Sequence, residues 1–365
     1  MLNLHRGTIN KAMSRTKTGS KYFNLVKSLY QYVVKCKMIY SRFEAHKTRR
    51  EVIKRKGKKV VNRQIKRSIK QYARKRFGSK AYWPYLALYT EIRGQFVEGW
   101  LPDDYFRYVL VPQISSASSV HISEYKTFDY QIFGDFALKP LFVFISGIFL
   151  NADFEPLNKE QVIKALQEYD AIIVVKEDMG HQGKQVRMIH SSEFKIECLK
   201  KGRSYVIQPL VKQYKAINDL YSGSVNTFRV GTFIKNDGSV VVKFAALRFG
   251  VDGLKVDNLS SGGQLIYFDC DGKPSHRAYD ELGFDMGERH KNSGYLFADL
   301  KVPMFQEVLQ ACINAHGKFP YDRLVGWDVC IDASGKPVLL EWNTNPGFRS
   351  FEYVFGPFFP EDDII

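Results

Sequence analysis

The chain has few cysteines and no long apolar run, and both shortages narrow the class of protein. Its five cysteines are scattered, odd in number and without a C-x-x-C pair (Cys36, Cys198, Cys270, Cys312, Cys330). This argues against a disulfide framework and a zinc site, and predicts a reducing, cytoplasmic location. "LFVFISGIFL" at 141–150 is the nearest candidate for a membrane span. It is about half the roughly 18 residues that a spanning helix needs, so it is predicted to be core.

Acidic residues are scarce in the first part of the chain. Residues 1–80 contain 25 Lys or Arg but only Glu44 and Glu51, a net charge of 25 − 2 = +23. The whole chain of 365 residues is +16, so residues 81–365 carry 16 − 23 = −7. Within 21–43, apolar residues recur three or four apart, which predicts one apolar helical face. They are Tyr22, Leu25, Leu29, Val33, Cys36, Tyr40 and Phe43. Residues 1–80 are therefore predicted to be a basic, mainly helical region.

The rest of the chain has the pattern of an α+β protein with much antiparallel sheet. Residues 81–137 form a mixed, aromatic-rich region punctuated by prolines and a serine-rich loop at 113–120. Helices are predicted at 158–170, capped by Asn158, and at 303–317, ending at Gly317. β-branched and alternating patterns predict strands at 171–176, 204–208, 227–235, 239–248, 264–269, 325–331 and 337–343.

The stretch "VLLEWNTNPG" at 338–347 places polar residues in an apolar strand. Glu341 and Asn343 share one strand face, because side chains alternate between faces. Two strand-like runs flank "DASGKP", which predicts a hairpin centred between Ser334 and Gly335. In that register Asp328 lies opposite Glu341, and both carboxylates converge with Asn343. An all-oxygen set of this kind suits Mg²⁺. The alternatives are an acid pair on a solvated hairpin face or a register shifted by one residue.

Two further segments suit anionic oxygens. Strand "AIIVVK" ends in Lys176, and Gly180 and Gly183 follow, an arrangement in which a lysine and backbone N–H groups can bind phosphate. A plain hairpin is the alternative, since no Walker loop or G-x-G-x-x-G is present. Arg229 and Arg248 lie in segments predicted to be strands, and Asn258 follows ten residues after Arg248. Arginine in a strand suits a bidentate anion, although an ordinary ion pair between strands explains it equally.

The order of these motifs over residues 82–350 resembles the ATP-grasp superfamily, and within it most nearly the sugar-transfer-associated group linked to exopolysaccharide genes. The motifs are Lys139 in "FALKPLF", Lys176 with its glycines, "YVIQPLV", "NTFR", "LRFG", "DNLSSGG", "GWDV" and "VLLEWNTNPG". The resemblance implies an ATP-grasp fold, in which two α+β subdomains clamp ATP. A small lid subdomain would span 138–211 and a catalytic subdomain 212–365, after the basic region 1–80 and the mixed region 81–137.

The resemblance also implies roles for residues. ATP would be held by Lys139, Lys176, the loop with Gly180, His181 and Gly183, and the backbone of Gln208, Leu210 and Val211. Mg²⁺ would be held by Asp328, Glu341 and Asn343. Arg229, Arg248 and Asn258 would stabilise an acyl phosphate or the leaving phosphoryl group. The loop departs from the family pattern, with Glu177 where proline is usual and His181 where a small residue is common.

The function implied is an ATP- and Mg²⁺-dependent ligase that joins a carboxylate to an amine in surface-polysaccharide or related metabolite assembly, with a sugar or lipid-linked saccharide among the conceivable substrates. A kinase on the same fold is one alternative. A non-catalytic protein that binds polyanions or membrane surfaces is another. For residues 1–80 the candidate partners are an anionic membrane at its inner face, an acidic polymer, or a nucleic acid. A helical pair packed on the body by its apolar face is the remaining possibility.

Overall fold

The structure is a computed structural model that describes residues 17–116, 119, 121–180, 186–344 and 346–359. The chain divides into two compact units. The helical unit comprises residues 1–119 and 348–365, and the sheet unit comprises residues 120–347. The predicted boundaries at 80, 137 and 211 remain predictions. No helix among the described residues has the length and apolar character needed to cross a membrane.

The helical unit is built around one buried helix. Its helices are α2 (Lys17–Lys56), α3 (Arg63–Phe77), α4 (Trp83–Arg93), α5 (Asp103–Tyr105), α6 (Val111–Ile114) and α11 (Arg349–Val354). Helix α4 is buried along most of its length, and the C-terminal part of α2 packs on it through Ala45 and Val52. The Arg49 guanidinium donates to Glu91 at 2.7 Å. The two basic helices are separated at Gly57, where φ is +66°.

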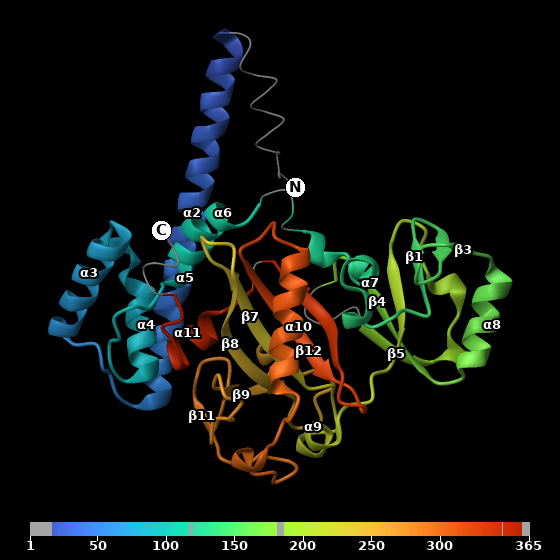
Figure 1. Cartoon of the computed structure of the whole chain (residues 1–365). Helices are drawn as coiled ribbons and strands as arrows, with labels where there is room; N and C mark the ends of the chain where they lie inside the picture. The colour runs from blue at the N-terminus through green and yellow to red at the C-terminus, as the bar shows by residue number, and fades with distance from the viewer. Residues whose placement is uncertain (1–16, 117–118, 120, 181–185, 345, 360–365) are drawn as a thin grey trace. The chain divides into compact units, whose positions relative to one another are not determined.

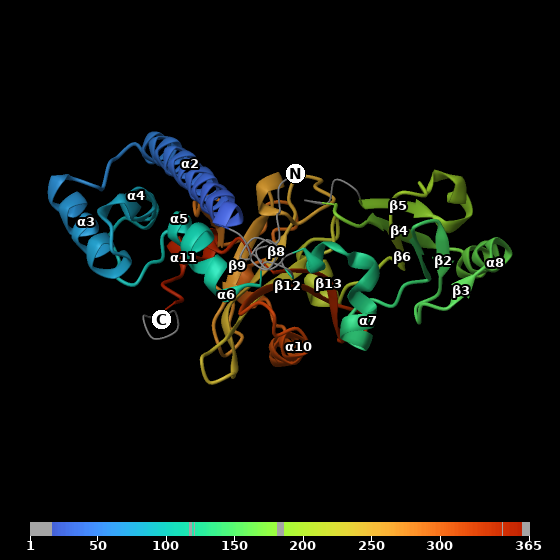
Figure 2. The same cartoon turned by 90° about the horizontal axis from the view of Figure 1, so that it is seen from above.

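The first sheet of the sheet unit has six antiparallel strands in the order β3-β2-β1-β6-β4-β5. They are β1 (Phe142–Ile145), β2 (Ile148–Leu150), β3 (Pro156–Leu157), β4 (Ile172–Glu177), β5 (Val186–His190) and β6 (Tyr205–Pro209). Helix α8 (Lys159–Tyr169) packs on the sheet through Val162 and Leu166 (Figure 2). The predicted cap is confirmed, because the Asn158 side chain accepts from the backbone N–H of Gln161 in a capping box. Residues 141–150 form the β1–β2 hairpin, and Phe142, Phe144 and Phe149 lie in the core as predicted, whereas Ile148 is exposed.

The second sheet has seven antiparallel strands in the order β11-β10-β9-β8-β7-β12-β13. They are β7 (Thr227–Ile234), β8 (Val240–Phe249), β9 (Gln264–Phe268), β10 (Ala278–Tyr279), β11 (Asp285–Gly287), β12 (Leu324–Ile331) and β13 (Pro337–Asn343). Helix α10 (Phe305–Lys318) lies across β7, β8 and β12 (Figure 1). The predicted end of this helix at Gly317 is wrong, because the helix continues to Lys318 and the buried Phe319 follows it. Short helices α7 (Asp129–Phe133) and α9 (Lys215–Leu220) complete the unit.

The core between α10 and the second sheet contains a chain of polar groups. The indole N–H of Trp327 donates to Thr232 Oγ1 at 2.7 Å, and that hydroxyl lies 2.7 Å from His316 Nδ1. His316 Nε2 lies 2.8 Å from the carbonyl of Asp322. A neutral imidazole with its proton on Nε2 satisfies every one of these contacts. Burial lowers the pKa of His316 to about 4.

Replacing His316 by glutamine should therefore flatten one part of the stability–pH profile. Between the unfolded pKa of 6.5 and the folded pKa of about 4, the unfolded chain binds a proton that the folded chain does not. Stability thus falls as the pH falls through this window, by roughly 3 kcal/mol from this group. Urea unfolding of both proteins across the window should show the gap between wild type and H316Q narrowing at low pH, and parallel profiles would contradict the assignment.

Candidate functional site

A row of charged side chains crosses one face of the seven-stranded sheet. In β13, Trp342 is fully buried on the core face, whereas Glu341 and Asn343 are half-buried on the other face, as the alternation predicts. Asp328 on β12 pairs directly with Glu341 on β13, and on its other side it pairs with Arg229 on β7. Three neighbouring strands thus bring a carboxylate, a second carboxylate and a guanidinium into one line.

The predicted pairing of Asp328 with Glu341 is confirmed, but the register near the hairpin tip is not. Ile331 pairs with Pro337 rather than Val338. Gly335, at φ +91°, ends a tight loop in which Asp332 pairs with Lys336, and this shifts the tip by one residue. The register is restored by a bulge between Asp328 and Val329, where Leu340 is the extra residue on β13.

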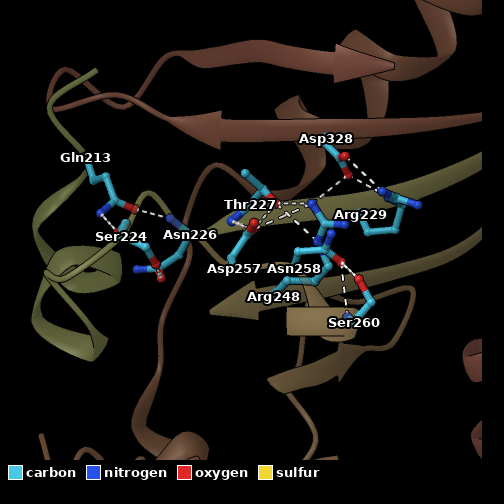
Figure 3. A network of polar contacts seen from close by, with 10 residues as sticks. All are labelled: Gln213, Ser224, Asn226, Thr227, Arg229, Arg248, Asp257, Asn258, Ser260 and Asp328. Carbon is cyan, nitrogen blue, oxygen red and sulfur yellow. Dashed lines mark hydrogen bonds and ion pairs between the residues drawn. The ribbon is translucent and has the colours of Figure 1, made fainter. Parts of the chain in front are cut away.

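Asp328 is held by two arginines (Figure 3). Arg229 donates to both of its carboxylate oxygens, from Nε at 2.5 Å and Nη2 at 2.8 Å. Arg248 Nη2 lies 3.1 Å from Oδ1 of the same carboxylate. Burial alone would raise the pKa of Asp328, but the two guanidinium charges outweigh it and hold this pKa below its usual value. The predicted alternative of an ion pair between strands is therefore what the structure contains at both arginines.

A second carboxylate, Asp257, anchors Arg248 from the other side. Its Oδ2 lies 3.6 Å from Arg248 Nη2 and accepts the backbone N–H of Thr227 at 3.0 Å and the Thr227 hydroxyl. Arg248 also donates to that hydroxyl from Nη2 at 2.8 Å. Burial would lower the pKa of Arg248, but the charges of Asp257 and Asp328 raise it. Asp257 was not predicted as a site residue, although it directly precedes Asn258, which was.

A lysine from the first sheet reaches the second sheet at the bulge. Lys176, at the end of β4, donates from Nζ to the carbonyl of Leu340 at 3.2 Å. The pKa of Lys176 is lowered by burial, which the charges of Glu341 and Asp129 partly oppose. A pocket of about 340 Å³, open to solvent, is lined by Lys126, Lys176, Glu177, Gly180, Val186, Leu340 and Glu341. Two of the predicted phosphate-binding residues and one predicted metal ligand thus meet in one place.

Lys126 belongs to this pocket and was not predicted. It is buried, it donates from Nζ to the carbonyl of Gly180 at 3.1 Å, and its Nζ lies 3.9 Å from Glu341 Oε1. Nothing in the stretch "SEYKTF" marks it as a ligand-binding residue. Its position follows from a tertiary contact, because Asp178 accepts both the backbone N–H and the hydroxyl of Thr127.

The remaining predicted residues are placed as follows. Lys139 lies outside the pocket, exposed, with its Nζ 6.0 Å from the centre of the Tyr130 ring. Gln208 lies in the central strand β6 and donates to the carbonyl of Leu138 at 3.0 Å. Leu210 donates its backbone N–H to Ile172 at 3.3 Å, and Val211 follows, half-buried. The Asn258 side chain accepts from the backbone N–H of Ser260 and so caps a short turn. Among the described residues it makes no hydrogen bond with Asp328. His181 and Gly183 lie outside the described residues.

Three features of the two antiparallel sheets make up the candidate site: a lysine-lined pocket beside the Glu341 carboxylate, a buried carboxylate clamped by two arginines, and a contact between the sheets at the bulge. A family model described as sugar-transfer associated ATP-grasp matches residues 171–358, just over half of the 365 residues. The chain belongs to this family and has the ATP-grasp fold that the sequence predicts.

Solved structures that resemble the chain are distant from it in sequence. Biotin carboxylase from Campylobacter jejuni, in an ATP-analogue complex, is 11% identical with a TM-score of 0.39 over 65% of this chain and 44% of that chain. D-alanine-D-alanine ligase from Coxiella burnetii is 9% identical with a TM-score of 0.36 over 64% of this chain and 50% of that one. The ATP-grasp ligase PsnB is 14% identical with a TM-score of 0.35 over 66% and 56%. The chain thus spans about half the length of these proteins. A search of the curated proteins found no match.

Proposed function

We propose that the protein is an ATP- and Mg²⁺-dependent ligase that joins a carboxylate to an amine through an acyl phosphate. The observation that carries this proposal is the convergence of Lys126, Lys176 and Glu341 on one pocket. Two ammonium groups suit the phosphates of a nucleotide, and a half-exposed carboxylate beside them suits a metal ion that neutralises those phosphates. Membership of the ATP-grasp family supports the same reading.

The residues available for Mg²⁺ fit that ion by their donor chemistry. Glu341, Asp328 and Asn343 offer only oxygen ligands, which magnesium prefers. The Glu341 side chain is 40% exposed, and its ion pair with Lys126 is long, at 3.9 Å. Asp328 accepts two hydrogen bonds from Arg229 and lies 3.1 Å from Arg248 Nη2, and a carboxylate has about four acceptor positions. Among the described residues no group of three His, Cys, Asp or Glu side chains forms a metal cluster. We therefore assign Glu341 as the main ligand, with Asn343 and Asp328 supporting it.

Each group of the chain has a defined task in this reaction. Attack of a carboxylate on ATP brings two anions together, and Lys126 and Lys176 offset that repulsion by fixed positive charge. Bound Mg²⁺ would supply further charge neutralisation between the phosphates. The contacts described for Arg229 and Arg248 engage Nε and Nη2 of both. We assign their Nη1 groups to the acyl phosphate or the leaving phosphoryl. Asp328 and Asp257 keep these guanidinium groups aligned, so little reorganisation is needed.

Hydroxylamine trapping tests the reaction without knowledge of the natural amine. The protein is incubated with ATP, Mg²⁺, hydroxylamine and pools of amino acids, dicarboxylates and uronic acids. A ligase of this type releases ADP and inorganic phosphate and converts the accepted carboxylate to a hydroxamate. A kinase would release ADP without inorganic phosphate and yield a phosphate ester. ATP binding without turnover in any pool, with Glu341→Gln indistinguishable from wild type, would favour the non-catalytic alternative.

The two pocket lysines give a prediction with a built-in control. Lys126→Met and Lys176→Met should each weaken binding of a non-hydrolysable ATP analogue roughly 10- to 100-fold, because each removes a charge-assisted contact worth about 1.5–3 kcal/mol. Lys139→Met, outside the pocket, should leave binding unchanged. Isothermal titration calorimetry in the presence of Mg²⁺ measures all three. A loss confined to Lys139→Met would assign the phosphate role to Lys139 alone, one of the two lysines for which the family resemblance implies it.

A further inference from the structure

Between Leu25 and Phe43, helix α2 carries an apolar stripe that no described residue covers. Its members are Leu25, Leu29, Tyr32, Val33, Cys36, Ile39, Tyr40 and Phe43, all of them exposed. Apart from Cys36, they are between 43% and 67% exposed. At 100° per residue they fall within an arc of roughly 120°, and Leu25 to Phe43 extends about 27 Å along the helix axis. The alternative in which this face packs on the body is thus not what the described part of the chain shows.

Charge of one sign borders the stripe on both sides. Lys35 lies on one flank, Lys37 on the other and Lys27 behind, and all three are exposed. No acidic residue occurs in α2 before Glu44. The adjacent α3 adds seven further Lys or Arg and no acid, and its apolar residues Ile69 and Ala73 are buried. The exposed surface of these two helices is therefore apolar along the stripe, with Val26 and Tyr30 beside it, and mainly cationic elsewhere.

We propose that this stripe and its flanking lysines bind the surface of an anionic lipid bilayer, with α2 lying along the interface. Soluble proteins rarely expose a continuous apolar patch of this size unless it contacts a partner. A helix with one apolar face, lysine-rich borders and no acid has the composition of an interfacial helix. The helix is not apolar enough to span the bilayer. Lysine ammonium groups on both borders reach the headgroups while their stems lie against acyl chains.

The same residues disfavour a second copy of this helix as the occupant. Pairing two copies would place Lys35 and Lys37 of each at the borders of one seam with no acid to offset them. The stripe also contains Tyr32 and Tyr40, whose hydroxyls would need buried partners in a packed helix pair. At a membrane interface those hydroxyls remain at the hydrated headgroup level. Charge complementarity and tyrosine placement both point to lipid.

Vesicle flotation of the full chain tests the proposal, using phosphatidylcholine vesicles with and without phosphatidylglycerol and no ATP. The wild type should float with the anionic vesicles and remain unbound with the neutral ones. Leu29→Gln with Ile39→Gln should weaken binding at least about a hundredfold, because two large apolar side chains leave the interface. Lys35→Gln and Lys37→Gln together should weaken it roughly thirtyfold, since each lysine is worth about 1 kcal/mol near headgroups.

The matched control is Val34→Gln with Met38→Gln, the same kind of change on the opposite face of the same helix, which should leave flotation unchanged. Circular dichroism confirms that each variant keeps its helices. Equal binding by the stripe variant and the wild type would overturn the proposal, because simple attraction of basic residues would then suffice. A lipid-free dimer that the stripe variant converts to monomer, with no vesicle binding, would overturn it in favour of a second copy. Binding to duplex DNA but not to vesicles would overturn it in favour of nucleic acid.

Discussion

Glu341→Gln should reduce ATP turnover by roughly a hundred- to ten-thousand-fold while the unfolding transition stays where it is. The loss follows from the charge that the proposed metal site needs, since stabilisation of charge by a bound ion is worth several kcal/mol in such reactions. The fold should tolerate the change, because Glu341 is half-exposed and its ion pair with Lys126 is 3.9 Å long. Exposed pairs contribute about 0–1 kcal/mol. ADP release measures the loss of turnover, and Mn²⁺ titration measures the loss of metal binding.

Glu177→Gln is the matched control, since Glu177 lines the same pocket but its carboxylate is paired with Arg203 at 2.9 Å. Its expected effect on turnover is less than about tenfold, because that pair is at the surface and is not assigned to the metal. If both glutamine variants lost activity equally, the pocket would depend on overall negative charge and not on Glu341 as a ligand. If neither lost activity, the metal assignment would be wrong.

Asp328→Asn should lower the free energy of unfolding by about 3–5 kcal/mol, because it removes the negative charge that pairs with two buried guanidinium groups. Arg229 and Arg248 both bond to this carboxylate, and the Arg248 side chain is nearly buried. A second contribution is specific to pH. The pKa of Asp328 is held below its usual value, so the stability it provides is present above the unfolded pKa and is lost as the pH falls through the folded pKa.

Urea unfolding of Asp328→Asn beside Glu341→Gln makes this a comparison of two acids that face each other on neighbouring strands. A large shift in the first and none in the second separates the acid that holds the arginines from the acid that faces the pocket. Equal midpoints for both variants would mean that the arginine clamp contributes little to stability. Arg229→Met should lower the free energy of unfolding by less than Asp328→Asn does, because Arg248 still pairs with the Asp328 carboxylate.

The sequence predicted what depends on local pattern. The alternation in "VLLEWN" placed Trp342 in the core and Glu341 outside it, and the flanking turn residues predicted the hairpin that pairs Glu341 with Asp328. The glycine of "GWD" and the proline of "NPG" also meet, because a Cβ on Gly326 would lie 2.6 Å from Pro346 Cβ. Any larger residue at position 326 would push the two motifs apart, so their close contact requires the glycine.

Features that arise from tertiary contact were not predictable in the same way. Lys126 lies in the pocket because hydrogen bonds from Thr127 to Asp178 fix the turn that carries it. No residue spacing in the sequence predicts those hydrogen bonds. The bulge at Leu340 depends on where the hairpin loop ends, a matter of turn geometry rather than of hydrophobic pattern. Lys139 resembled a phosphate ligand by its order in the chain, yet its side chain lies exposed beside Tyr130.

The stacked indoles of Trp327 and Trp342 provide the sheet unit with its own optical signal. Their ring centres are 5.9 Å apart and their planes differ by 13°, close enough for the two transitions to couple. The chain's other tryptophans, Trp83 and Trp100, belong to the helical unit. A near-ultraviolet circular dichroism band from the stacked pair would therefore report the packing of the sheet unit alone. Because Trp342 stands between Glu341 and Asn343, that band is also a spectroscopic probe of the strand on which the proposed chemistry depends.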